Sequence, residues 1–268
     1  MRIMFGRFRF LDEENNTEID FDGEVFDGIV YPAPEYQNVD DEYALASLLV
    51  LPPVSPSKII CVGLNYSDHA RELNMPVPEN PILFLKPPTA VLPHNGCISY
   101  PAVSRQVDYE AELAVVIEKD GHNIDLEDAY SYIAGFSCFN DVTARDLQKA
   151  DGQWTRAKSF DTFAPLGPFI VTPEELEQQG LNPENLNIQT RITDADGNVR
   201  ICQNSNTSEF IFKIPELISF ISSVMTLKKG DVIATGTPPG VGQLIPGDLV
   251  DVEIEGIGTL SNAVIDEI

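Results

Sequence analysis

The stretch Val107–Ile117, VDYEAELAVVI, has the composition of a buried β-strand but carries two acidic side chains. Side chains two positions apart in a strand point to the same side, so Glu110 and Glu112 share one face and the residues alternating with them share the other. The sequence therefore predicts a strand with a local concentration of negative charge on one face. Such a pair needs a cation, a proton or water beside it.

The composition is that of a folded chain with a sizeable core. Its 268 residues are 43% hydrophobic, which fits one large domain or a large domain with a small appendage. There is no run of about 18 apolar residues, no charged leader and no lipidation signal, so we expect a cytoplasmic protein without a membrane partner. The four cysteines are far apart and form no C-x-x-C pair, which favours reduced thiols over a zinc site.

The charge balance is strongly acidic. The chain has 42 acidic and 17 basic residues and a formal net charge of −25, so nucleic acid is not expected as a partner. The acidic residues are scattered, and their repulsion destabilises a compact state in dilute buffer. We hypothesise adaptation to molar salt, where the Debye length is about 3 Å. The alternative is an ordinary acidic enzyme.

The chain divides at a proline-rich segment. Residues 2–10 alternate like a strand, and the segment LPPVSPSK at 51–58 has three prolines that exclude a helix or a central strand. The sequence therefore predicts a small N-terminal domain with its linker over residues 1–55 and a larger domain over residues 56–268.

Short β-rich segments dominate the larger domain. Strands are expected in 58–66, 81–86, 107–117, 129–140, 166–171, 187–193, 231–236 and 249–260. Helices are expected in 67–75, with Ser67 or Asp68 as cap, in 142–150, in 172–179 with Thr172 as cap, and in 208–224. Few strand–helix–strand units occur, which disfavours a doubly wound nucleotide-binding fold and predicts a β-rich α+β protein.

Three carboxylates are candidate metal ligands. Glu110, Glu112 and Asp141 supply the hard oxygen donors that Mg²⁺, Mn²⁺ or Ca²⁺ select. The alternative is a solvent-facing strand edge, with Asp141 as a helix N-cap. A helix after Asn140 places Asp141, Arg145 and Gln148 on one face, where they can point at one site or form an ordinary Asp–Arg pair.

Other candidate groups are cations, a histidine and a turn. Lys86 and Lys158 lie in weakly polar stretches, where they either reach a site or extend to the surface. His69 and Glu72 are three positions apart on a helical turn, so the carboxylate can orient the imidazole as a general base; the alternative is a solvated turn. The turn Gly236–Gly242, GTPPGVG, has backbone amides suited to an anionic oxygen but no phosphate-loop ending.

Six segments, in this order, resemble the fumarylacetoacetate hydrolase superfamily and in particular its compact acylpyruvase-type members. They are VGLNYSDHARE, PILFLKPPTAV, VDYEAELAVVI, GFSCFNDVTARDLQ, WTRAKSFDTFAPLGPFIV and DVIATGTPPGVG, within about residues 58–262. The resemblance implies a mixed β-strand roll with a small N-terminal domain, and a homodimer. Val62 stands where the larger members carry an acidic metal ligand seven positions before a histidine, so the compact members are the better guide.

The resemblance also implies roles for single residues. Glu110, Glu112 and Asp141 would hold Mg²⁺ or Mn²⁺, and His69 with Glu72 would activate water from a lid segment. Lys158 matches an active-site lysine. The substrate-facing residues implied are Arg145, Gln148 and Thr237, with Gly236 and Lys86 counted beside them.

A metal held by three carboxylates can chelate a 2-oxo acid and stabilise its enolate. We therefore expect hydrolysis of a C–C bond in a 2,4-dioxo acid of acylpyruvate or fumarylpyruvate type. The alternatives are isomerisation of 2-hydroxyhepta-2,4-diene-1,7-dioate with the associated tricarboxylate decarboxylation, oxaloacetate decarboxylation, and, from another class, a non-catalytic Ca²⁺-stabilised binding module.

Overall fold

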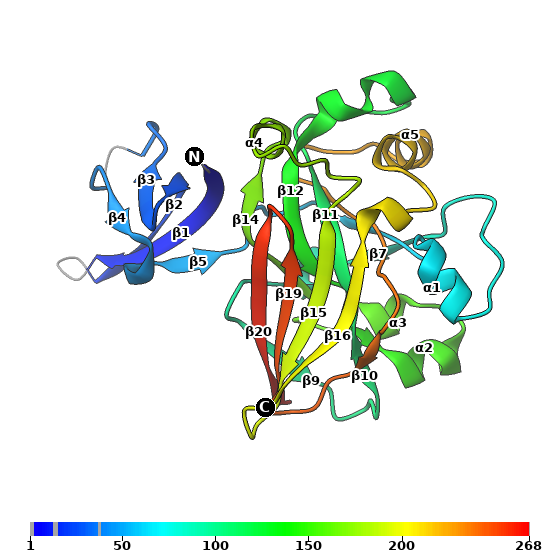
Figure 1. The fold of residues 1–268 in the computed structure, drawn as a ribbon. Helices are drawn as coiled ribbons and strands as arrows, with labels where there is room; N and C mark the ends of the chain where they lie inside the picture. The colour runs from blue at the N-terminus through cyan, green and yellow to red at the C-terminus, as the bar shows by residue number, and fades with distance from the viewer. Residues whose placement is uncertain (1–2, 13–15, 37–38, 268) are drawn as a thin grey trace.

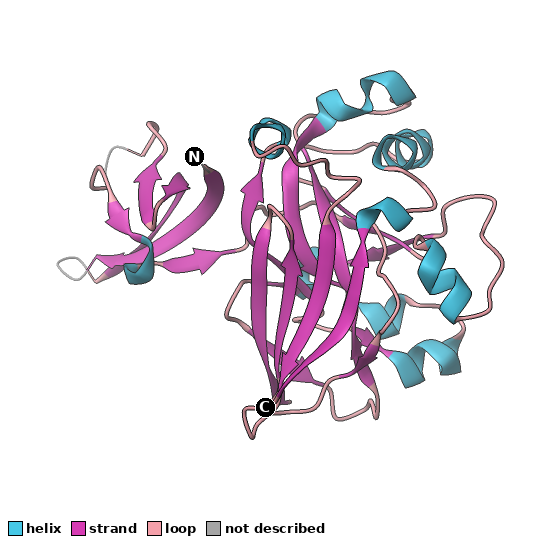
Figure 2. Ribbon diagram, viewed as in Figure 1, coloured by secondary structure: helices cyan, strands magenta, loops and turns pink. Residues whose placement is uncertain are grey.

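A computed structural model describes residues 3–12, 16–36 and 39–267, and its architecture is a β-rich roll flanked by short helices (Figures 1 and 2). The described strands form one large mixed sheet, one sheet of three strands and one of five. The β-rich α+β fold predicted from the sequence is confirmed.

The large sheet runs in the order β4-β3-β2-β1-β14-β12-β11-β17-β6-β7, with β5 paired to β1 and β8 paired to β14. Its strands are β1 Met4–Asp12, β2 Thr17–Phe26, β3 Ile29–Pro32, β4 Tyr43–Ala44, β5 Leu49–Leu51, β6 Ile59–Val62, β7 Leu83–Lys86, β8 Val91–Leu92, β11 Ala111–Ile117, β12 Ile133–Asn140, β14 Ala164–Val171 and β17 Val232–Ala234.

Two smaller sheets complete the roll. The sheet of three is β13 Thr143–Ala144, β10 Val107–Tyr109 and β18 Gly242–Gln243; the sheet of five is β16 Val199–Asn206, β15 Asn187–Thr193, β19 Leu249–Ile254, β20 Gly258–Asp266 and β9 Cys97–Tyr100. Side chains of the five-stranded sheet and of the central strands share one core, where Leu113 and Phe136 meet Ile188 and Val252. Figure 1 shows the five-stranded sheet packed across the central strands.

The helices are short. They are α1 Ser67–Glu72, α2 Arg145–Asp151, α3 Thr155–Lys158, α4 Pro173–Gln178 and α5 Ile214–Val224, with 3₁₀ turns at η1 Leu45–Ser47, η2 Pro88–Ala90, η3 Leu126–Tyr132 and η4 Thr207–Glu209. None of the helices in the described part of the chain has the length and apolar character needed to cross a bilayer.

The helix caps follow the sequence in one case and depart from it in another. The hydroxyl of Thr172 accepts a hydrogen bond from the Glu175 amide at 3.2 Å, so the predicted cap of α4 is confirmed. The prediction for α1 was wrong, because the helix begins after Tyr66 and no side chain caps it. Ser67 and Asp68 bind other elements instead.

The N-terminal strands β1 to β5 surround a separate apolar cluster that includes Phe8, Phe21 and Val25. They are connected to the rest of the large sheet where Phe5 of β1 pairs with Ile170 of β14. In Figure 1 this group lies on the opposite side of the molecule from α1 and α2. The prolines of 51–58 follow β5 in a segment without helix or strand, as the sequence predicts.

The stretch Val107–Ile117 does not form one strand. β10 ends at Tyr109, β11 begins at Ala111, and the two strands belong to different sheets with Glu110 between them. All of these residues are buried, so the predicted solvent-facing edge is absent from the stretch. The chain changes sheets at the residue that carries the first carboxylate.

Strand directions bring four chain segments to one end of the central sheet. β17 runs parallel to β6, whereas β11 runs antiparallel to both β17 and β12. The carboxyl ends of β6, β12 and β17 therefore meet the amino end of β11 at one edge. α1, Asp141 and the Gly236–Gly242 turn follow these three ends directly.

Candidate active site

A buried acidic cluster lies at this edge of the sheet. Glu110, Glu112 and Asp141 each place a carboxylate oxygen within 4.8 Å of the others, and all three residues are buried. Asp141 follows β12, and its amide donates to the Glu110 carbonyl at 2.9 Å. The predicted helical face was wrong for Asp141, because α2 begins only at Arg145. Strand pairing, and not a helix, brings Asp141 to the glutamates.

Two buried lysines donate to the cluster. Lys158 Nζ lies 2.9 Å from Glu110 Oε2 and 2.6 Å from Asp141 Oδ2. Lys86 Nζ lies 2.5 Å from Asp141 Oδ1 and 3.0 Å from the carbonyl of Val142. Burial lowers the pKa of both ammonium groups, but Asp141 and Glu110 outweigh it at Lys158 and raise that pKa, whereas the pKa of Lys86 stays lowered. Neither lysine extends to the surface.

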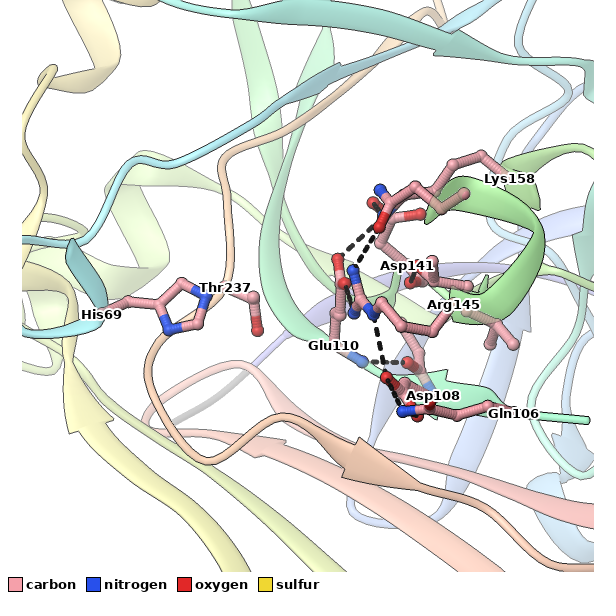
Figure 3. Close-up of polar contacts among 12 residues, drawn as sticks. His69, Gln106, Asp108, Glu110, Asp141, Arg145, Lys158 and Thr237 are labelled. Carbon is pink, nitrogen blue, oxygen red and sulfur yellow. Dashed lines mark hydrogen bonds and ion pairs between the residues drawn. The ribbon is translucent and has the colours of Figure 1, made fainter. Parts of the chain in front are cut away.

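Arg145 extends the network from α2 (Figure 3). Its guanidinium donates to Asp108 Oδ2 at 2.9 Å, to Gln148 Oε1 at 2.7 Å and to Glu110 Oε1. Burial alone would raise the pKa of Glu110, but the charges of Lys158 and Arg145 lower it to about 2. Glu110 is therefore held as a carboxylate between two cations.

Glu112 has different surroundings. Burial and the charges of Asp141 and Glu110 raise its pKa well above the ordinary value. Its Oε2 accepts a hydrogen bond from the Gly236 amide at 2.8 Å, and no lysine or arginine in the described ranges forms an ion pair with it. The predicted anion-binding amide of the turn is thus occupied by a protein carboxylate.

The donor set fits a divalent metal ion. Three buried carboxylates offer hard oxygen ligands at one point, which is the chemistry that Mg²⁺ and Mn²⁺ select. A positive ion would also favour the charged form of Glu112, whose pKa is raised by burial and by the charges of Asp141 and Glu110. Glu110, Glu112 and Asp141 are thus the residues that would hold it.

His69 and Glu72 form a hydrogen-bonded pair on α1. His69 Nδ1 lies 2.8 Å from Glu72 Oε2, and Glu72 Oε1 accepts from the Gly240 amide at 3.1 Å. α1 itself is tied to the opposite sheet, because Asp68 Oδ2 accepts from the Ser205 hydroxyl at 2.6 Å. The imidazole is therefore oriented through Nδ1, and its Nε2 is left for another partner.

One cavity of about 260 Å³ joins the pair to the acidic cluster. Its polar wall consists of His69, Glu110, Glu112, Arg145, Gln148, Lys158 and Thr237. Phe84 and Trp154, whose rings meet edge to face at 5.1 Å, form part of its apolar wall. Glu72, Asp141 and Gly236 do not line the cavity, but they form hydrogen bonds to His69, Lys158 and Glu112, which do. Lys86 does not line it either, so the structure does not bring this predicted substrate contact to the cavity.

Three residues of the network went unnoticed in the sequence. Asp108 receives Arg145, Asn140 accepts the Glu110 amide at 3.0 Å, and Gln203 donates to the Thr237 hydroxyl at 2.8 Å. Asp108 adjoins the E-x-E segment and Asn140 precedes Asp141, so proximity was a usable signal for both. Gln203 lies in an unremarkable polar segment, CQNSN, and had no such signal.

The roll and the site define an enzyme class in which a buried acidic centre faces a small polar cavity. The family model described as fumarylacetoacetate (FAA) hydrolase C-terminal matches residues 58–265. The chain belongs to the fumarylacetoacetate hydrolase family, and three of the four relatives named next carry the names of enzymes.

Two relatives illustrate the range of sequence identity and coverage. An uncharacterized protein of Archaeoglobus fulgidus is 55% identical, with 98% of this chain and 96% of that protein covered. The mitochondrial oxaloacetate tautomerase Fahd2a of Rattus norvegicus is 44% identical, with 80% of this chain and 68% of that protein covered.

Solved structures confirm the fold. The 5-carboxymethyl-2-hydroxymuconate delta-isomerase of Mycobacterium smegmatis has a TM-score of 0.84 at 38% identity, with 99% of each chain covered. The maleylpyruvate hydrolase of Sphingobium sp. SYK-6, in complex with manganese (II) and pyruvate, has a TM-score of 0.81 at 27% identity, with 99% of this chain and 100% of that chain covered.

Proposed function

We propose that this enzyme binds Mg²⁺ or Mn²⁺ at its three carboxylates and hydrolyses a C–C bond in a 2,4-dioxo acid of acylpyruvate or fumarylpyruvate type. The observation that carries the proposal is the shared cavity. The imidazole of His69, which Glu72 orients, lines the same cavity as Glu110 and Glu112. A general base beside a cation-binding centre is the combination that hydrolysis of such an acid requires.

The metal would supply a positive charge next to the 2-oxo acid, where negative charge grows as the C–C bond breaks. The structure of the maleylpyruvate hydrolase of Sphingobium in complex with manganese (II) and pyruvate supports this choice of ligands.

Arg145, Lys158 and the Thr237 hydroxyl, which line the cavity, would orient the substrate. Three N–H groups of Arg145 are committed to Asp108, Gln148 and Glu110, and a guanidinium has five, so two remain for a substrate oxygen. Lys158 lies at the cavity wall with the positive charge that a carboxylate needs.

His69 would act as the general base. Its Nε2 takes a proton from water, and the resulting hydroxide adds to the carbonyl carbon farther from the substrate carboxylate. The oxyanion formed by this addition collapses to a carboxylic acid as the C–C bond breaks, the electron pair of that bond goes to the 2-oxo acid fragment as an enolate, and the proton held by His69 completes that product. Glu72 stabilises the imidazolium through Nδ1, at 2.8 Å.

A second candidate is keto–enol tautomerisation of a small 2-oxo dicarboxylic acid. Two relatives, from Rattus norvegicus and Bacillus subtilis, are each 44% identical and are named oxaloacetate tautomerases. A cavity of about 260 Å³ suits a four-carbon acid. In this reaction His69 would move the proton at the carbon beside the 2-oxo group, and no water would be consumed. The named isomerase of Mycobacterium smegmatis supports a related double-bond shift as the further alternative.

The two reactions separate on a small substrate panel. Acetylpyruvate, fumarylpyruvate, oxaloacetate and 2-hydroxyhepta-2,4-diene-1,7-dioate are followed by ultraviolet absorbance with Mn²⁺ in high KCl. Hydrolysis of the first two, abolished by EDTA, by Glu112→Ala and by His69→Ala, is the expected result. Turnover that survives both EDTA and Glu112→Ala would refute the metal proposal. Conversion of oxaloacetate without release of CO2, and no activity on the other three acids, would establish the second candidate.

The homodimer implied by the family resemblance stays a prediction. Sedimentation of the protein in high KCl measures its mass directly, and a species of about twice the chain mass is expected. A monomer at micromolar concentration would contradict it.

A further inference from the structure

Gln203 is a completely hydrogen-bonded amide buried beside the site. Its Oε1 accepts from the Ala111 amide at 3.0 Å and from the Thr190 hydroxyl at 2.7 Å. Its Nε2 donates to Thr237 Oγ1 and to the Pro238 carbonyl, both at 2.8 Å. The residue has no exposed surface, and these four bonds use both amide hydrogens and both lone pairs of the oxygen.

The direction of the Gln203 amide is fixed by its neighbours. The Ala111 N–H can only donate and the Pro238 carbonyl can only accept. A flipped amide would place its Nε2 against the Ala111 N–H, donor to donor, and its Oε1 against the Pro238 carbonyl, acceptor to acceptor. Two independent backbone groups therefore require Nε2 to face the turn. Ala111 lies between the two glutamates of the acidic cluster, so the same side chain joins that segment to the turn.

This direction decides what the Thr237 hydroxyl can do. Because Nε2 only donates, Thr237 Oγ1 must accept from it, and the hydroxyl proton of Thr237 is left to point elsewhere. No acceptor for that proton is found in the part of the chain that the structure describes. Thr237 lines the cavity with Arg145 and His69, and Figure 3 shows it on the side of the acidic cluster that faces His69.

We propose that Gln203 is a positioning residue that holds Thr237 as a hydrogen-bond donor to an anionic or carbonyl oxygen of the substrate. The inference rests on the proposed function in taking a 2-oxo acid as that substrate. Gln203 lies outside the cavity, but through Thr237 it determines that the ligand must place a hydrogen-bond acceptor, and not a donor, at this point of the cavity wall. A ligand group that can only donate, such as an ammonium, would face the Thr237 proton at that point and bind poorly.

The test is a double-mutant cycle on pyruvate binding in the presence of Mn²⁺. Trp154, the single tryptophan of the chain, lines the cavity and reports binding by its fluorescence. Thr237→Val removes the hydroxyl while keeping the side-chain shape. Gln203→Glu replaces the donor by an acceptor, so the Thr237 proton turns away from the cavity.

Each single variant is expected to weaken pyruvate binding by roughly tenfold or more, the loss typical of one hydrogen bond to a charged group. The double variant is expected to bind pyruvate no more weakly than the single variant with the lower affinity, because Gln203 acts through Thr237. Losses that multiply would overturn the inference, since the added charge or a packing defect would then explain the Gln203→Glu effect. The matched control is Thr190→Val, which breaks another bond to the same amide and should lower Tm without changing pyruvate affinity.

A second measurement keeps the inference testable if Gln203→Glu does not fold or if the wild type fails to bind pyruvate. That failure to bind would count against the proposed function. Unfolding temperatures of Gln203→Met, Thr237→Val and their double variant need no ligand. Losses in Tm that are less than additive support the coupling of the two side chains. Strictly additive losses would overturn it.

Discussion

Glu110 and Glu112 are two positions apart but differ in their electrostatic surroundings. Glu110 receives Lys158 and Arg145, whereas Glu112 receives one backbone amide and faces two other carboxylates. Glu110→Gln leaves the buried Lys158 and the partly buried Arg145 each short of a partner, so we expect a loss of about 3 kcal/mol of stability. Glu112→Gln keeps an acceptor for Gly236 and removes repulsion, so stability in EDTA should be unchanged or higher.

Both glutamine variants should lose Mn²⁺ binding, because each removes one proposed ligand. Quenching of Trp154 fluorescence measures the binding, and thermal unfolding in EDTA measures stability. Equal stability losses in the two variants would contradict the difference between the two sites.

The raised pKa of Glu112 also predicts a pH dependence. Burial and two neighbouring carboxylates raise the pKa of Glu112 in the folded protein above the value of 4.5 that it has in an unfolded chain. The folded state therefore keeps a proton that the unfolded state has lost, and stability falls as pH rises through this interval, by up to about 1.4 kcal/mol per pH unit. Glu110, with a pKa of about 2, behaves in the opposite sense: its contribution is present above 4.5 and is lost only as pH falls toward 2.

Comparison with Glu112→Gln isolates this effect, because the amide does not titrate. In EDTA, the Tm of the variant minus that of the wild type should increase from about pH 5 upward until Glu112 ionises in the folded state. A difference that stays constant over this range would argue against the raised pKa.

The six-residue helix α1 depends on contacts made far away in the chain. A helix of this length is marginal on its own, and Asp68 holds it to Ser205 of β16 at 2.6 Å. Asp68→Ala should let α1 fray and displace His69, with a roughly ten- to hundredfold loss in kcat. Mn²⁺ affinity should stay unchanged, because its ligands lie on other segments.

The matched control for Asp68→Ala is Arg71→Ala. Arg71 is on the same helix, but its side chain is 72% exposed and its ion pair with Glu209 is at the surface, so its removal should change kcat little. Hydrogen exchange at 67–72 locates the fraying. A parallel loss of Mn²⁺ affinity in Asp68→Ala would show that the damage extends beyond α1.

Local patterns predicted the elements well, and long-range contacts limited the prediction of their details. The cap of α4 was predictable because Thr172 directly precedes Pro173, whereas Ser67 and Asp68 bind residues more than a hundred positions away. Burial of Lys86 was missed for the same reason, since Asp141 lies 55 positions later. The change of sheet at Glu110 has no signal in composition, because the residues on both sides are equally strand-like.

Across the whole molecule, the charge pattern separates the interior from the surface. Near the site, Asp108, Glu110 and Asp141 form ion pairs with Lys86, Lys158 and Arg145, and Glu112 is left without one among the described residues. The excess of 42 acidic over 17 basic residues is therefore carried by the rest of the chain. Exposed carboxylates that form no ion pair with the described residues lie in several parts of the chain: Glu127 and Asp128 on η3, Glu177 on α4, and Asp161 and Asp196 in turns.

The net charge of −25 predicts that this protein gains stability with salt. Repulsion between exposed carboxylates acts over about 10 Å at 0.1 M salt and over about 3 Å at 1 M, so added KCl removes a term that opposes the compact state. A gain of a few kcal/mol corresponds to a rise in Tm of roughly 5–10 °C for a chain of this size.

Replacing Glu127, Asp128, Asp161, Glu177 and Asp196 by lysine adds two charges at each position and changes the net charge from −25 to −15. That variant should be more stable than the wild type in dilute buffer and should gain less from KCl, with little difference between the two proteins in molar salt. Unfolding curves of both proteins from low to molar KCl measure this, and a wild type whose Tm does not rise with salt would leave only the reading of an ordinary acidic enzyme.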